Sequence, residues 1–208
     1  MGDALVSGLL AGYGVAIPVG AIAVLIIGLS AQASLAVGAG AALGVAAADG
    51  IYALVAVLGG AALASVIRPV ATPLRVVAAV VLFVIAGRIA LNAWRHFHDP
   101  TRRVATPLLR TPSRAFAGLL GLTLLNPTTI VYFAALVLGQ KSSGTATSAG
   151  ASAVFVVAAF VASASWQLLL AAGGSALGRT LASDRGRLIT AIVSAAVIVA
   201  LAIRTLGG

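Results

Sequence analysis

The chain has 208 residues, of which 61% are hydrophobic and only 8% are charged. A soluble domain would carry about 25% charged residues, so this chain has too little polar surface to face water on all sides. The composition therefore excludes an ordinary soluble domain and predicts an all-α integral membrane protein. Because a membrane-spanning helix needs roughly 20 apolar residues, the length allows six transmembrane helices with short loops.

The charged residues are mostly basic, with a formal net charge of +9, four Asp and no Glu. In a soluble protein this balance would indicate nucleic-acid binding. Here the Arg residues cluster between apolar segments, where basic residues set membrane orientation and contact lipid headgroups. We therefore expect a lipid bilayer as partner and no nucleic acid. Cysteine is absent, which excludes disulfides, thiolate metal sites and thiol–disulfide relays.

The first apolar segment covers residues 4–29 and contains Pro18 and Gly20. It is too long for the apolar part of a signal peptide and has no basic start, so we expect a retained helix. Proline removes a backbone donor and clashes with the preceding turn. The segment is therefore either a kinked helix or a discontinuous one whose freed backbone groups face a central cavity.

The second apolar segment, residues 34–67 at its widest, carries the acid Asp49 near its middle. A carboxylate at that depth costs about 2.5 to 3.5 kcal/mol and usually faces a cavity, a partner or a pathway. Tyr52 follows three residues later on the same helical face, where it can donate a hydrogen bond to Asp49 or only pack beside it. We expect the other helices to be arranged around Asp49.

Glycine pairs four residues apart occur in both of these segments, as Gly8 with Gly12 and Gly40 with Gly44. Such small-residue spacings let two helix backbones approach closely. They favour tight packing inside the chain and would also support a homodimer.

A turn at residues 68–75 leads into the third segment, residues 75–94, which contains Arg88. The Arg88 side chain can extend to the membrane interface as an anchor. It can equally pair with Asp49, and the sequence leaves both alternatives open.

The one long polar connection, residues 95–114, holds five Arg, three Pro and both His. His96 and His98 are two residues apart, so they do not share a helical face, and the chain has no second pair of His. We therefore expect a solvated loop there and no metal site.

The fourth segment, residues 115–138, contains Asn126 directly before Pro127. An amide at mid-membrane can satisfy the carbonyls that the proline frees, and it can also face a substrate. The two roles are compatible, and the depth of Asn126 favours the second.

The fifth segment, residues 148–173, carries the polar run Ser163-Ala164-Ser165-Trp166-Gln167. Polar side chains at this depth can form hydrogen bonds between helices. The sixth segment, residues 188–206, is apolar except for Arg204 near its end.

The two halves of the chain resemble each other. Gly8 precedes Pro18 by about the interval that separates Gly118 from Pro127. Three helices per half would force the halves into opposite orientations, with a binding site at mid-membrane between broken helices. We expect two inverted three-helix repeats at residues 1–95 and 115–208, joined by a basic cytoplasmic connection at residues 96–114.

The basic loops predict the orientation. The connections at residues 95–114 and 178–187 carry more Arg than the other loops, so the positive-inside rule places both in the cytoplasm and both termini outside. The Arg residues at 68 and 75 argue weakly against this orientation.

These features together resemble the L-lysine exporter (LysE) family of bacterial amino-acid exporters. The resemblance rests on Ile17-Pro18-Val19-Gly20, on the Asp49 segment from Gly44 to Gly59, on Leu125-Asn126-Pro127 and on Ser163-Ala164-Ser165-Trp166. Many members have a second proline, often followed by Asn, after the motif glycine, where this chain has Ala21 and Ile22. The resemblance implies six helices in the bacterial inner membrane, export of a small amino acid or similar solute, and coupling to protons.

We therefore expect a secondary transporter in which Asp49 binds and releases a proton while the broken helices hold the solute. No catalytic residue, cofactor or metal is expected. The expected substrate-binding residues are Pro18, Gly20, Asp49, Tyr52, Asn126, Pro127, Trp166 and Gln167. The alternatives are a membrane enzyme or redox relay, a divalent-metal exporter, and a non-transporting scaffold in which Asp49 pairs with Arg88.

Overall fold

The computed structural model describes residues 1–18, 20–67, 71–98, 109–126, 129, 132–133, 148–180 and 184–207. Within these ranges the chain is helical, without strands. The helices are α1 (Gly2–Ala16), α2 (Ala21–Gln32), α3 (Leu35–Ile67), α4 (Ala71–His98), α5 (Pro112–Leu124), α7 (Ala149–Thr180) and α8 (Asp184–Gly207).

The first apolar segment is discontinuous. Helix α1 ends at Ala16 and α2 begins at Ala21, and the two helices are bent by 77° relative to each other. Pro18 lies in a bend between them. Of the two alternatives for this segment, the broken helix is confirmed.

Several helices are longer than the sequence pattern indicates. Helix α3 fills the widest limit expected for it, and α7 continues to Thr180. The turn expected at residues 68–75 is wrong for residues 71–75, because α4 starts at Ala71 and includes Pro73 in its first turn. Proline is tolerated there because the N–H groups of a first turn have no partner within the helix. The polar connection is correspondingly shorter, since α4 extends to His98 and α5 starts at Pro112.

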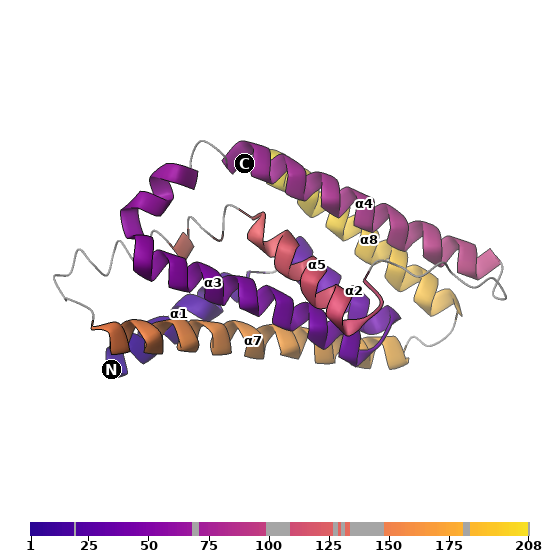
Figure 1. Cartoon of the computed structure of the whole chain (residues 1–208). Coiled ribbons are helices and arrows are strands. Elements are labelled where there is room, and N and C mark those ends of the chain that lie inside the picture. The colour runs from indigo at the N-terminus through magenta and orange to yellow at the C-terminus, as the bar shows by residue number, and fades with distance from the viewer. Residues whose placement is uncertain are drawn as a thin grey trace.

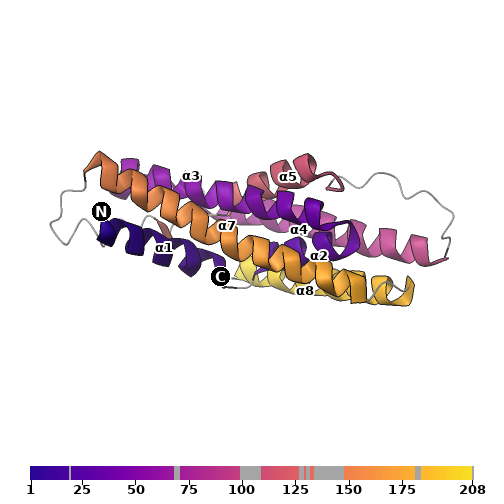
Figure 2. The same ribbon diagram turned by 90° about the horizontal axis from the view of Figure 1, so that it is seen from below.

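The helices pack as a bundle in which α4 and α8 lie side by side along one edge (Figures 1 and 2). Helix α3 packs most extensively against α7 and α5, while α1 and α2 both pack against α7. Helix α2 also contacts α3 and α8, so it lies between the edge pair and the rest of the bundle.

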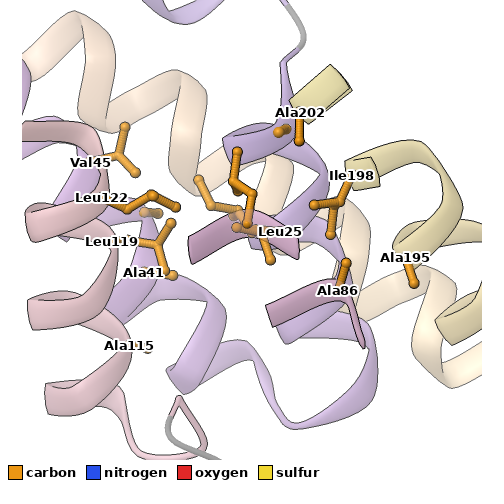
Figure 3. Packing of buried hydrophobic residues seen from close by; sticks show 14 of the residues in the cluster. Leu25, Ala41, Val45, Ala86, Ala115, Leu119, Leu122, Ala195, Ile198 and Ala202 are labelled. Carbon is orange, nitrogen blue, oxygen red and sulfur yellow. The ribbon is translucent and has the colours of Figure 1, made fainter. Parts of the chain in front are cut away.

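The larger hydrophobic core forms around α2. Leu25 of α2 is fully buried and lies between a group from α3 and α5 and a group from α8 (Figure 3). Leu119 of α5 and Ile198 of α8 are the fully buried large side chains of those two groups. A second, smaller cluster joins α1, α3 and α7 around Ala11, Tyr52 and Phe155.

Glycine spacings fix the closest helix pairs. A Cβ atom at Gly8 or Gly12 would collide with backbone carbonyl oxygens of α7, at Phe155 and Ala159. On α3, Gly40 and Gly44 lie in the same way against α5, at the carbonyls of Pro112 and Phe116. The close approach predicted from these spacings is confirmed within the chain.

Two described helical stretches are long and apolar enough to cross a membrane, namely Leu35–Leu58 of α3 and Ala149–Gly178 of α7. The bent pair of α1 and α2 is a third if it counts as one broken span. These apolar helices support the prediction that the chain is a membrane protein. Six spans arranged as two inverted repeats stay a prediction.

Candidate functional site

A cavity of about 220 Å³ lies beside the break between α1 and α2. Its apolar lining includes Val15, Ile22, Val45, Leu82 and Leu122. Its polar side chains are Asp49, Thr123, Asn126, Thr129 and Gln167. Drug-sized ligands occupy pockets of about 300 to 1,000 Å³, so this cavity suits a smaller solute.

Asp49 is the one charged side chain among the described residues of the cavity lining, and it is only 2% exposed. The Ser163 hydroxyl donates a hydrogen bond to Asp49 Oδ2 over 2.6 Å. Ser163 belongs to α7, so this bond joins the two longest helices at the cavity. The carboxylate therefore has a hydrogen-bond donor but no neighbouring cation among the residues that line the cavity.

Arg88 does not pair with Asp49. It is exposed on α4, and the described part of the chain contains no ion pair between the two residues. Of the two alternatives for Arg88, the ion pair with Asp49 is not formed, and the interfacial position stays a prediction.

Two further polar groups in the lining lack partners. The Oγ1 atom of Thr123 and the Oε1 atom of Gln167 are buried without a hydrogen-bond partner among the described residues. Thr123 is 2% exposed and Gln167 is 5% exposed, yet both line the cavity. Buried polar atoms are normally satisfied, so these two atoms are available to hydrogen-bond a molecule in the cavity.

The N-terminus of α2 also faces the cavity. Gly20 is its N-cap, in an extended conformation, and it has no side chain with which to cap the helix. Ala21, Ile22 and Ala23 form the first turn, whose N–H groups have no partner inside the helix, and all three residues line the cavity. A helix N-terminus of this kind carries partial positive charge and attracts anionic groups.

Tyr52 does not form a hydrogen bond with Asp49. Its hydroxyl donates a hydrogen bond to the backbone carbonyl of Leu124 over 2.6 Å and lies 3.4 Å from that of Thr123. The hydrogen bond to Asp49 that the spacing allowed is not formed, and Tyr52 is not part of the cavity lining. Since Leu124 is the last residue of α5, Tyr52 satisfies carbonyls where that helix ends.

Of the other expected site residues, Pro18, Gly20, Asn126 and Gln167 line the cavity together with Asp49. Trp166 does not line it and is partly buried, with its indole N–H unpartnered among the described residues. Pro127 lies outside the described residues.

The expected substrate-binding residues included neither Ser163 nor Thr123, although the polar run that contains Ser163 was expected to bond between helices, as the bond to Asp49 confirms. A signal for each exists, since Ser163 precedes Gln167 by four residues and Thr123 precedes Asn126 by three. The first spacing places Ser163 and Gln167 on one face of α7, whereas Asn126 follows the end of α5, which contains Thr123. A search for other polar residues three or four positions before Gln167 and Asn126 would have found both of them.

A broken helix beside a cavity with one buried acid is the arrangement of a membrane transporter. The family model described as LysE type translocator matches residues 14–207, nearly the whole chain, and the chain therefore belongs to the LysE type translocator family. Members of this family are transporters, and membership indicates export of an amino acid or similar small solute. Searches of curated proteins and of solved structures found no match.

Proposed function

We propose that this protein exports an amino acid or similar small solute across the bacterial cytoplasmic membrane in exchange for protons. The observation that carries this proposal is the position of Asp49, buried in a cavity beside a broken helix and without a cationic partner in the lining. Asp49 is the proton carrier, and the cavity is the solute site.

The proton role follows from charge. An ionised carboxylate in the apolar interior of a membrane protein is costly unless a cation or a proton neutralises it. The described residues of this lining include no cationic side chain, and we propose that Asp49 is neutralised either by a proton or by a positively charged group of the solute. Alternation between these two states is the minimal chemistry of an antiporter.

The proposed solute role of the cavity follows from the backbone and the polar side chains in its lining. The first turn of α2 offers N–H donors to an anionic group, as broken helices do in other transporters. Thr123 of α5, Gln167 of α7 and Asn126, which follows the end of α5, offer neutral polar contacts. In this proposal the Pro18–Gly20 segment lies at the carboxylate of a zwitterion, and Asn126 lies with Asp49 at its other end.

We further propose the inverted-repeat architecture at residues 1–95 and 115–208, with the connection at 96–114 in the cytoplasm and both termini outside. The helix packing supports it. Helix α1 meets α7 through close backbone contacts at Gly8 and Gly12, and α5 meets α3 through close contacts at Gly40 and Gly44. The first helix of each half therefore packs against the long helix of the other half.

The alternatives have less support. A divalent cation takes several oxygen ligands, whereas one carboxylate lines this cavity. A scaffold in which Asp49 only pairs with Arg88 would need the ion pair that the described residues do not form.

The test is transport in proteoliposomes that contain the purified full-length chain under an imposed pH gradient. Asp49→Asn keeps an oxygen that can accept the Ser163 hydrogen bond but cannot carry a proton at physiological pH. We expect uphill solute accumulation to fall to the level of empty liposomes, while the variant still folds. Asp3→Asn, at the exposed N-terminal end of α1, is the matched control and should transport as the unmodified chain does. Full proton-driven transport by Asp49→Asn would exclude the carrier role.

A further inference from the structure

We propose that the cavity selects a solute with one ammonium group, one carboxylate and an uncharged side chain, and that it rejects amino acids with a basic side chain. This inference rests on the proposed function, because it takes the cavity to be the solute site. It is carried by the distribution of donors, acceptors and charge over the cavity lining.

The acceptors for an ammonium group lie together in the lining. A primary ammonium has three N–H donors. The Asp49 carboxylate, Thr123 Oγ1 and Gln167 Oε1 are three acceptors on the same cavity, and the last two have no other partner among the described residues. One of the three is anionic, so one ammonium satisfies both the hydrogen bonding and the charge.

The donors for a carboxylate come from a different helix. The first turn of α2 has no side-chain cap, and Ala21, Ile22 and Ala23 all line the cavity. These N–H groups, together with the partial positive charge of the helix end, suit one carboxylate. A helix N-terminus is not by itself a binding site. Here the buried and unpartnered Thr123 Oγ1 and Gln167 Oε1 line the same cavity.

The described lining holds no second anionic side chain that could pair with a second positive charge. Once Asp49 pairs with the α-ammonium group, the other described residues of the lining are apolar or neutral, and the larger apolar ones are Val15, Ile22, Val45, Leu82 and Leu122. A side-chain ammonium placed among them would be buried without a counter-ion. The penalty for a charge in such surroundings corresponds to a discrimination of about 50-fold or more.

Four matched probes test the inference by calorimetric binding to the full-length chain in nanodiscs. Norvaline has the amino-acid head group and a neutral chain. Ornithine is the same molecule with a terminal ammonium, butylamine lacks the carboxylate, and pentanoate lacks the ammonium. We expect norvaline to bind at least about 50-fold more tightly than ornithine, and both single-group probes to bind more weakly than norvaline.

Equal or tighter binding of ornithine would overturn the inference, as would equal binding of butylamine or the absence of binding by all four probes. Thr123→Val removes one ammonium acceptor at nearly constant volume and should weaken norvaline binding, whereas Thr123→Ser, which keeps the hydroxyl, should restore it. The proposed export is tested separately, by transport with Asp49→Asn. Preferential binding of ornithine would therefore refute this inference and leave the proposed export standing.

Discussion

The two helix breaks among the described residues differ in the backbone groups that they leave without a partner in the helix. Between α1 and α2 the break exposes a helix start, whose N–H groups face the cavity without a cap. At the end of α5 the break exposes carbonyl groups, and the Tyr52 hydroxyl reaches across from α3 to satisfy them. Both breaks have a proline beside them in the sequence. The start of α2 has no side-chain cap, whereas the last carbonyl of α5 accepts a hydrogen bond from Tyr52. A proline in an apolar segment therefore marks a break without saying what the freed groups do.

The position of the α2 N-terminus depends on how α2 packs against α7. A substitution at a glycine of this contact has the largest expected effect on stability. A Cβ atom at Gly174 would collide with the backbone of Ile27 in α2, whereas the neighbouring Gly173 has open space around it. We expect Gly174→Ala to destabilise the protein by about 1 to 3 kcal/mol through overpacking. Gly173→Ala should be neutral or stabilising by up to about 1 kcal/mol, because alanine favours a helix. Thermal unfolding in detergent compares the two, and equal melting temperatures would contradict the packing.

At the end of α5, the last carbonyl depends on the Tyr52 hydroxyl for its hydrogen bond. Tyr52→Phe removes this hydroxyl without changing the ring. The Leu124 carbonyl would then lose the partner it has at 2.6 Å. We expect a loss of stability of about 1 to 2 kcal/mol, the usual cost of a buried acceptor left unpaired. Tyr13→Phe is the control, because the Tyr13 hydroxyl bonds Ser165 at an exposed position. If Tyr52→Phe cost no more than Tyr13→Phe, the hydroxyl would not hold the end of α5.

The smallest effect is expected from removing a single donor at the start of α2. Ala21 is the first residue of α2, a position where proline fits a helix, and the preceding Gly20 is extended, as a residue before proline prefers. Ala21→Pro should therefore leave the melting temperature unchanged. It should weaken norvaline binding by about 3- to 10-fold, the value of one hydrogen bond, as measured by calorimetry. Unchanged affinity would mean that the N–H group of Ala21 does not contact the solute.

Much of the site could be predicted because apolar segments make rare residues conspicuous. Asp49, Asn126 and Gln167 stand out by polarity, and Pro18 with Gly20 stands out as a helix breaker. All five line one cavity. Ser163 and Thr123 were missed because a hydroxyl residue in an apolar helix can bond its own backbone, so its presence alone does not indicate a site.

The partner of Tyr52 could not be predicted, for a different reason. Its position on the helix relative to Asp49 is a local property of α3, which the sequence reveals. Its actual bond is to Leu124, which is 72 positions away in the sequence and comes close only when α5 packs against α3. Helix ends were also misjudged where proline occupies a first turn, as Pro73 does in α4.

The glycine contacts along α7 have a mechanical consequence. Gly8 and Gly12 of α1 meet α7 near Phe155 and Ala159, and α7 meets α2 through Gly174 and Gly178. At these contacts the two helix backbones touch without a side chain between them. No side-chain rotation can therefore accommodate the sliding of one helix past the other. We therefore expect α1, α2 and α7 to travel as one rigid body when the cavity changes the side to which it opens, with the α4 and α8 pair as the counterpart that shifts against them.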